Sequence, residues 1–279
     1  MMPDIRVNGV AGDRIAVTDR GLHYGDGLFE TLAVRAGIPQ LWQRHWRRLS
    51  RGCERLGIEG VAAQALWDEA REICSDTEQG VLKIIITRGE AGRGYRPAAT
   101  GEATRILARY PWPDYPDTHR HEGVAVRICA TRLGRNPALA GMKHLNRLEQ
   151  VLARREWDDP RIAEGLMLDD LGQVISGTMS NLFMVKAGQL ATPRLDECGV
   201  EGVMRGLILD LAEEMTIPCQ QTVLSLQDLQ VADELFLCNA LIGLWPVRRM
   251  DRQAYTIGPI TQLLSERLSA RQLELKHES

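Results

Sequence analysis

A proline-rich stretch near the middle of the chain constrains the fold most, because it divides the sequence into two halves. The stretch reads Pro111-Trp112-Pro113-Asp114-Tyr115-Pro116-Asp117. Proline lacks an amide hydrogen and fixes its own backbone angle, so this stretch can continue neither a helix nor a strand ladder. We therefore predict two domains in the 279-residue chain, residues 1–112 and 121–279, joined by a linker over residues 113–120.

The half before this stretch alternates strand-like runs with helical patterns. The Asn8-Gly9 pair is typical of a hairpin turn after the strand-like Ile5-Arg6-Val7. Apolar residues that recur every three or four positions predict helices, and β-branched runs between turn signals predict strands. The predicted helices cover residues 42–56 and 61–74, and the further strands cover residues 28–34, 80–87 and 105–110.

The half after the stretch mixes the same two patterns. Its predicted strands cover residues 124–131, 166–168, 182–185 and 234–238, and its predicted helices cover residues 144–157, 203–214 and 260–275. Because both halves contain strands as well as helices, we predict the fold class α+β, or mixed α/β.

The composition excludes several classes of protein. The chain is 44% hydrophobic and 25% charged, and its net charge of −3 offers no basic surface for nucleic acid. It contains no long apolar run that predicts a membrane span, and residues 1–6 lack the apolar core of a signal peptide. The six cysteines are far apart, and the six histidines show no metal-ligand spacing. We therefore expect a cytoplasmic protein with reduced thiols that binds no metal, nucleic acid or membrane.

Lysine is rare in this chain, which makes Lys143 a candidate for amine chemistry. Of the 34 basic residues only Lys83, Lys143, Lys186 and Lys276 are lysines, and the other 30 are arginines. A lysine amine can lose its proton and form a Schiff base with a carbonyl, which a guanidinium cannot do. Lys83 lies in a strand-like run, whereas Lys143 lies between a Gly/Pro-rich loop and a helical pattern. An ordinary exposed lysine at a helix start is the alternative.

Three features are suited to an anionic group. Gly202 precedes the helical run that begins Val203-Met204, and free amides at a helix N-terminus attract anions. The turn Asn239-Ala240-Leu241 follows a strand and offers further amides. Arg48 lies beside the apolar stripe of its helix, where a guanidinium can clamp a phosphate with two parallel hydrogen bonds. A plain helix start, an ordinary turn and a solvated charged face are the respective alternatives.

Several short motifs are spread over nearly the whole chain. Tyr24-Gly25-Asp26-Gly27 and Ser180-Asn181-Leu182-Phe183 resemble motifs of the fold-type IV pyridoxal-phosphate enzymes, which include branched-chain and D-amino-acid aminotransferases. The segment 133–150, with Lys143-His144-Leu145-Asn146-Arg147 at its centre, is more specific. It resembles the 4-amino-4-deoxychorismate lyases and not the transaminases.

This resemblance implies a fold like that of D-amino-acid aminotransferases, with a smaller N-terminal α/β domain and a larger, barrel-like C-terminal domain. It implies a pyridoxal 5'-phosphate-dependent carbon–oxygen lyase of folate biosynthesis. Such an enzyme converts 4-amino-4-deoxychorismate to 4-aminobenzoate and pyruvate by proton abstraction and elimination. The resemblance also implies a homodimer, and it leaves open a functional coupling to the enzyme that makes the substrate.

The resemblance implies roles for individual residues. Lys143 would carry the cofactor and act as the catalytic base, and Thr31 would lie near the reacting centre and relay a proton. The residues expected around the cofactor phosphate are Arg48 and the backbone at Val203, Met204, Asn239, Ala240 and Leu241.

One position departs from the family pattern. The family commonly has a glutamate in Gly-x-Val-x-Glu, hydrogen-bonded to the pyridine nitrogen, and the ungapped match here ends in Ser176. A carboxylate keeps that nitrogen protonated and makes the ring a strong electron sink, whereas a hydroxyl can donate to an unprotonated nitrogen. We therefore hypothesise that Ser176 favours elimination over transamination. Replacement of the glutamate by a nearby group or water is the alternative.

The substrate of such a lyase carries two carboxylates and needs cationic partners. Arg93, with Tyr95 beside it, is the candidate because Gly92 and Gly94 can form a tight loop at the mouth of a pocket. A mobile surface loop is the alternative. A branched-chain or D-amino-acid aminotransferase is the alternative activity, and a non-catalytic binding module on the same scaffold is the alternative class of function.

Overall fold

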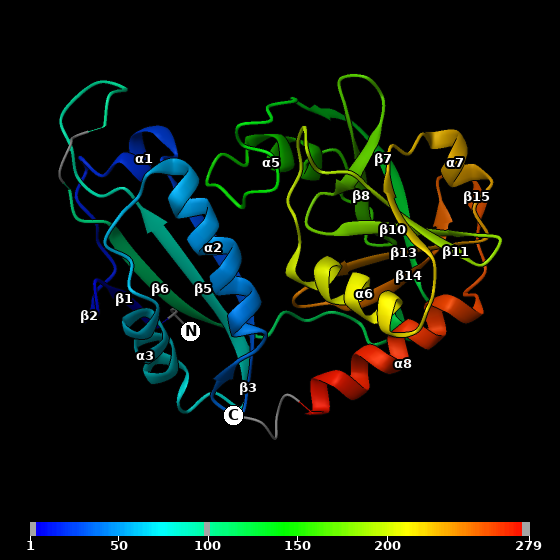
Figure 1. Ribbon diagram of the computed structural model, residues 1–279, viewed down its shortest axis with the longest axis horizontal. Helices are drawn as coiled ribbons and strands as arrows, with labels where there is room; N and C mark the ends of the chain where they lie inside the picture. Colours follow the sequence, from blue (N-terminus) through cyan, green and yellow to red (C-terminus); the bar gives the residue numbers. More distant parts are fainter. Residues whose placement is uncertain (1–3, 98–100, 275–279) are drawn as a thin grey trace. The chain divides into compact units, whose positions relative to one another are not determined.

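The computed structural model describes residues 4–97 and 101–274, which form two compact units (Figure 1). The first unit extends to Asp114 and also takes in Met142–Asn146. The second contains Tyr115–Gly141 and the chain from Arg147 onward. The predicted division differs here, because it assigned residues 142–146 to the C-terminal domain.

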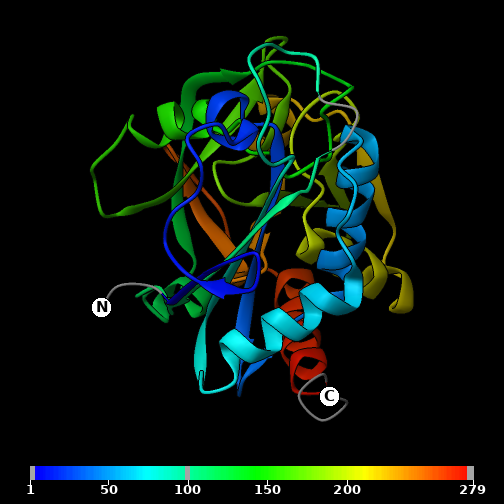
Figure 2. The ribbon, with the colours of Figure 1, turned by 90° about the vertical axis from the view of Figure 1, so that its left-hand side faces the viewer.

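The first unit is built on a six-stranded antiparallel sheet with the strand order β2-β1-β6-β5-β3-β4. Its strands are β1 (Asp4–Val7), β2 (Val10–Ala11), β3 (Gly27–Arg35), β4 (Ile38–Pro39), β5 (Gln79–Thr87) and β6 (Thr104–Pro111). Its helices are α1 (Arg20–Tyr24), α2 (Trp42–Leu56) and α3 (Ala63–Cys74). Figure 2 shows α2 alongside the strands of this sheet.

Local sequence signals account for most of this unit. Asn8 and Gly9 have φ angles of 52° and 83°, the left-handed backbone that a two-residue hairpin turn between β1 and β2 requires. The predicted helix over residues 42–56 is confirmed as α2, and it ends where the left-handed Gly57 amide closes on the Cys53 carbonyl. The predicted hairpin and strands of this half are likewise confirmed.

The two faces of β3 have different environments. The side chain of Leu28 contacts α2 at Gly52, where an added Cβ would lie 2.8 Å from a Leu28 methyl carbon. Glu30 also reaches α2, so the alternate residues of β3 on this face are buried beneath the helix. Phe29 and Thr31 therefore lie on the opposite face of the sheet, where both are only partly buried. We call this opposite side, with Phe29, Thr31 and Lys83, the Phe29 face.

The second unit is built on a nine-stranded mixed sheet that follows the path β12-β11-β10-β13-β14-β7-β8-β9, with β15 paired to β14. Its strands are β7 (Val124–Leu133), β8 (Ile162–Asp169), β9 (Val174–Gly177), β10 (Asn181–Lys186), β11 (Gln189–Pro193), β12 (Cys219–Thr222), β13 (Glu234–Asn239), β14 (Gly243–Met250) and β15 (Gln253–Ala254). The sheet curls around a core that includes the fully buried Leu182, Leu237 and Val247. The predicted fold class and the barrel-like C-terminal half are thus confirmed.

The helices of the second unit are α4 (Thr118–His121), α5 (Leu148–Arg154), α6 (Val203–Glu214), α7 (Leu226–Gln230) and α8 (Pro259–Glu274). The predicted helix over residues 203–214 is confirmed as α6. The short helix α4 begins inside residues 113–120, which we predicted to be a linker, and ends one residue beyond them. No helix in the described part of the chain is both long and apolar enough to span a membrane.

The predicted helix over residues 144–157 is wrong at its start, because α5 begins only at Leu148. The preceding residues are not helical, and residues 143–145 pair with the start of β3. The Phe29 amide donates to the Lys143 carbonyl at 2.9 Å, and the Leu145 amide donates to the Gly27 carbonyl at 3.0 Å. This pairing also explains why Met142–Asn146 belongs to the first unit.

Candidate active site

The position of Lys143 is fixed because its backbone pairs with β3. Its carbonyl accepts the Phe29 amide, and its neighbour His144 forms a bridge with Leu28. The Lys143 ammonium lies 4.3 Å from the centre of the Phe29 ring, within the range of a cation–π contact. The only partly buried Lys143 side chain therefore has a defined position beside Phe29.

A buried carboxylate lies on the other face of β3. The Arg48 guanidinium donates to Glu30 through Nε (2.8 Å to Oε1) and through Nη2 (2.5 Å to Oε2). Two parallel bonds to one carboxylate fix the plane of the guanidinium as well as its position. Arg48 is thus anchored by a protein carboxylate, and its contact with a cofactor phosphate stays a prediction.

His45 completes this cluster as a neutral ring. Its Nδ1 lies 2.6 Å from Glu30 Oε2, and its side chain is 2% exposed. Burial lowers the pKa of His45, as do the charges of Arg48 and Lys143, although Glu30 opposes the change. A neutral imidazole that donates from Nδ1 leaves Nε2 as an acceptor. This buried Nε2 has no hydrogen-bond partner among the described residues.

Glu30 is ionised despite its complete burial. Burial alone would raise its pKa, but the charge and hydrogen bonds of Arg48, with the hydrogen bond from His45, lower the pKa to about 2. Sequence reasoning missed this residue. The available signal was a single carboxylate in the strand-like run 28–34, whose other residues are apolar except Thr31.

The N-terminus of α6 has the form predicted for an anion site. Gly202 occupies the N-cap position, and no side chain caps the helix there. The amides of Val203 and Met204 therefore open the first turn, where the helix dipole favours negative charge. Asn181 fixes this junction, since its Nδ2 donates to the Val200 carbonyl at 2.9 Å. A Cβ on Gly202 would lie 2.0 Å from Asn181 Oδ1, so Asn181 by itself requires glycine there.

The turn after β13 departs in one respect from the prediction. The Asn239 Oδ1 accepts the amides of Leu241 and Ile242 at 2.8 and 2.9 Å. The Leu241 amide is therefore engaged with a side chain, and our expectation that it donates to a phosphate does not fit this arrangement. Ala240 remains as the predicted backbone donor of the turn.

Ser176 is buried on β9, and its hydroxyl hydrogen is donated to a backbone carbonyl. Its Oγ donates to the Gly177 carbonyl at 2.8 Å, so the hydroxyl presents an acceptor lone pair rather than a donor. Glu164 on β8 is the nearby buried carboxylate. Its oxygens accept the amides of Gly165, Thr178 and Met179 and the hydroxyls of Thr178 and Ser180. Glu164 thus holds the turn after β9, and replacement of the family glutamate by a nearby group or water stays the alternative.

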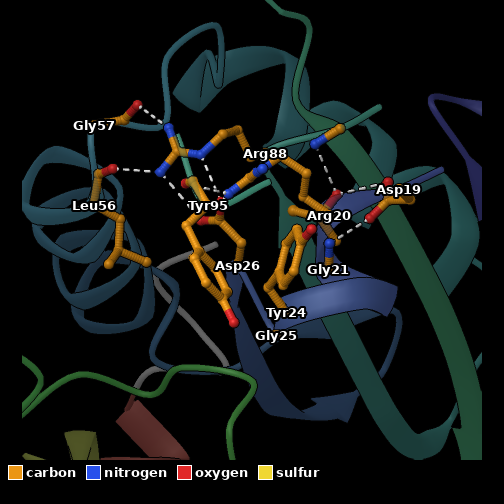
Figure 3. Close-up of polar contacts among 12 residues, drawn as sticks. Asp19, Arg20, Gly21, Tyr24, Gly25, Asp26, Leu56, Gly57, Arg88 and Tyr95 are labelled. Carbon is orange, nitrogen blue, oxygen red and sulfur yellow. Dashed lines mark hydrogen bonds and ion pairs between the residues drawn. The ribbon is translucent and has the colours of Figure 1, made fainter. Parts of the chain in front are cut away.

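A network around Asp26 fixes the loop that carries Arg93 and Tyr95 (Figure 3). The Asp26 carboxylate accepts hydrogen bonds from both Arg20 and Arg88, with each Nε 2.8 Å from Oδ2. Burial would raise the pKa of Asp26, but the bonds and charges of the two arginines hold it below its ordinary value. The carboxylate is therefore ionised and joins α1, β3 and the end of β5.

Each arginine of this network also binds backbone carbonyls. Arg88 donates to the carbonyls of Leu56 and Gly57 at the end of α2. Arg20 is 4% exposed and donates to the carbonyls of Gly94 and Tyr95 at 2.9 and 3.0 Å (Figure 3). The backbone at Gly94 and Tyr95 is thus tied to the Asp26 network.

The predicted substrate residues of this loop point outward within the first unit. Arg93 is exposed, and Tyr95 is 87% exposed with its ring 5.5 Å from that of Tyr24. Their contact with a substrate stays a prediction.

The predicted site residues are divided between the two units. Lys143, Thr31, Arg48, Arg93 and Tyr95 belong to the first unit. Ser176, the α6 N-terminus and the 239–241 turn belong to the second. Across residues 4–97 and 101–274, no group of three or more His, Cys, Asp or Glu side chains is arranged to hold a metal ion.

The Glu30 cluster predicts a defined dependence of stability on pH. Since folding lowers the pKa of Glu30 from 4.5 to about 2, its ionisation stabilises the fold above pH 4.5, and this contribution is lost as the pH falls toward 2. We expect Glu30→Gln to lower the free energy of unfolding at pH 7 by about 3–5 kcal/mol, because Arg48 loses its buried partner. Denaturant titrations should show that the difference in unfolding free energy between wild type and Glu30→Gln becomes smaller below pH 4.5. The control is Glu54→Gln on the exposed side of α2, and an equal effect of both variants would contradict the assignment.

The Arg20 network predicts how the loop resists proteolysis. Arg20→Met removes the two bonds to the Gly94 and Tyr95 carbonyls, each of which contributes about 1 kcal/mol. We expect trypsin to cleave the native protein between Arg93 and Gly94 about tenfold faster or more. Cleavage is followed by mass spectrometry, with Arg14→Met as the control because the Arg14 side chain is 95% exposed. Equal cleavage rates in both variants would show that Arg20 does not hold the loop.

Comparison with known proteins agrees with this geometry. The class IV aminotransferase family matches residues 27–250. An aminodeoxychorismate lyase of Vibrio harveyi is 35% identical over 94% of this chain and 98% of its own length. A putative branched-chain-amino-acid aminotransferase of Methanocaldococcus jannaschii is 30% identical over 91% of this chain and 90% of its own length.

Solved structures extend the comparison to the whole fold. The crystal structure of 4-amino-4-deoxychorismate lyase from Pseudomonas aeruginosa is 48% identical, with a TM-score of 0.93 over 95% of this chain and 98% of that chain. The chain therefore belongs to the class IV aminotransferase family, as its motifs predicted.

Proposed function

We propose that this protein is an aminodeoxychorismate lyase that converts 4-amino-4-deoxychorismate to 4-aminobenzoate and pyruvate with pyridoxal 5'-phosphate as its cofactor. The observation that carries the proposal is the pairing of the Lys143 segment with β3, which holds a lysine amine 4.3 Å from Phe29 in a chain with few lysines. The kinship with the Vibrio and Pseudomonas lyases supports the same activity.

The residues present fit this cofactor. The uncapped amides of Val203 and Met204 and the amide of Ala240 are suited to its phosphate, together with Arg48. His45 Nε2 is a buried acceptor without a protein partner among the described residues, as expected where a bound group or water completes a site. Ser176 would lie at the pyridine nitrogen, and its hydroxyl would turn from the Gly177 carbonyl to donate to that nitrogen.

Pyridoxal 5'-phosphate supplies an aldehyde that captures amines and a ring that withdraws electrons from the carbon beside the captured amine. Lys143 would hold the cofactor, and its amine would remove the proton from the amine-bearing ring carbon of the substrate. The bond from the adjacent carbon to the enolpyruvyl oxygen then breaks, and the Thr31 hydroxyl delivers a proton toward the departing group. The carbocyclic ring becomes aromatic and the enol becomes pyruvate, so no oxidant is needed.

The runner-up activity is that of a branched-chain-amino-acid aminotransferase, which the Methanocaldococcus relative favours. That reaction needs a keto acid as amine acceptor, whereas elimination does not. We further propose a homodimer, and Arg93 and Tyr95 as substrate-binding residues. A cytoplasmic location and a coupling to the enzyme that supplies the substrate stay predictions.

Replacement of Lys143 tests the proposed function directly. We expect Lys143→Ala to lose the visible absorbance band of the bound cofactor and to form 4-aminobenzoate and pyruvate about 1,000-fold more slowly, since it lacks both the cofactor amine and the base. The control is Lys186→Ala, which removes only a surface ion pair with Asp233. Products are quantified after the substrate is generated in place. A wild-type protein that yields no pyruvate but aminates a keto acid would replace the lyase with the aminotransferase.

Ser176 sets the balance between elimination and amine transfer in this proposal. We expect Ser176→Glu to raise transaminase side activity about tenfold or more relative to lyase activity, because a carboxylate keeps the pyridine nitrogen protonated. The measurement is keto-acid-dependent amination, with Ser176→Gln as the uncharged control of equal size. An unchanged ratio of the two activities in Ser176→Glu would refute the role of Ser176.

A further inference from the structure

Lys83 lies in the middle of β5, and its ammonium is on the Phe29 face. Its neighbours Leu82 and Ile84 are buried on the opposite face, at 0% and 1% exposure, whereas Lys83 is only partly buried. In the antiparallel register Lys83 is directly opposite Thr31 of β3. Side chains at directly opposed positions project from the same face with their Cβ atoms about 5 Å apart. The sequence alone marked Lys83 as an ordinary strand residue.

The Lys83 and Lys143 amines approach the same aromatic ring. The Lys83 ammonium lies 5.5 Å from the centre of Phe29, and the Lys143 ammonium lies 4.3 Å from it. On the next strand, β6, the residue paired with Lys83 is Ala108. Its methyl side chain is too small to cover the Lys83 ammonium. A hydroxyl and two amines are thus gathered on one face around Phe29.

Lys83 has no counter-ion within the described part of the chain. Lys186, by comparison, pairs with Asp233 at 3.1 Å. The Lys83 ammonium contacts the Phe29 ring at a distance near the outer limit of a cation–π interaction. A partly buried ammonium without a described carboxylate partner, on the face that also carries the Lys143 amine, raises the local positive potential and favours an anionic ligand.

We propose that Lys83 binds the carboxylate of the enolpyruvyl group of the substrate, an inference that rests on the proposed lyase function. The leaving oxygen lies near Thr31 in that mechanism, and the enolpyruvyl carboxylate is attached to the carbon next to this oxygen. The residue directly opposite Thr31 is therefore placed to receive it. Lys83 is a substrate-binding residue that holds the leaving group while the Lys143 amine acts on the ring.

Steady-state kinetics of Lys83→Met, Lys83→Arg and wild-type protein test this proposal. A charge-assisted hydrogen bond is equivalent to a factor of about 10–100 in affinity, so we expect Lys83→Met to raise the KM for aminodeoxychorismate by that factor. The kcat should fall less than the KM rises, and Lys83→Arg should recover much of the affinity. The inhibition constant of pyruvate should rise in Lys83→Met, while that of 4-aminobenzoate, which lacks this carboxylate, stays unchanged.

The controls separate this inference from the proposed function. Lys186→Met is the matched lysine variant, and the cofactor absorbance band should be the same in all four proteins. If the wild-type protein forms no products, the proposed function fails. If the wild type is active but Lys83→Met leaves both the KM and the inhibition by pyruvate unchanged, the Lys83 inference alone is overturned. A loss of the cofactor band in Lys83→Met would also overturn it, because Lys83 would then act on the cofactor.

Discussion

The backbone pairing between Met142–Asn146 and the start of β3 is the interaction on which the site depends. A lysine that acts on a bound amine needs a position fixed to a fraction of an ångström, which a helix start exposed to solvent does not provide. Two backbone hydrogen bonds, with Phe29 and with Gly27, give Lys143 that position without the use of a side chain. The same pairing brings a segment of the second half of the sequence into the first unit.

The two faces of β3 differ in their balance of charges. Glu30 is buried beneath α2, and its negative charge compensates the guanidinium of Arg48. The Phe29 face carries amines and a hydroxyl, and Lys83 there has no such compensation within the described residues. One strand therefore separates a charge-balanced structural cluster from a face where Lys83 has no counter-ion among the described residues, because successive side chains point to opposite sides. An anionic substrate would favour the second face.

Sequence patterns predicted the elements whose signals are local. The bounds of α2 and α6 follow from apolar periodicity and from glycine at their ends, and both were foreseen. The start of α5 was not, because residues 144–147 carry a helical pattern that pairing with β3 overrides. The polar edge strand β12 was missed for a related reason, since Cys219–Thr222 is a strand only through its parallel partner β11. Glu30 and Glu164 were missed because their partners are distant in sequence.

The two kinds of basic residue divide the functions of this chain according to their shapes. Arg48 and Arg88 each bind a carboxylate through a planar fork of two nitrogens. Arg20 binds Asp26 through Nε and uses its other two nitrogens on backbone carbonyls. Such a fork fixes an element in one orientation, so it is suited to holding loops and helices. A lysine ammonium on a flexible stem can follow a group that changes during a reaction. Two of the four lysines, Lys83 and Lys143, lie beside Phe29, where the proposed reaction needs such a group.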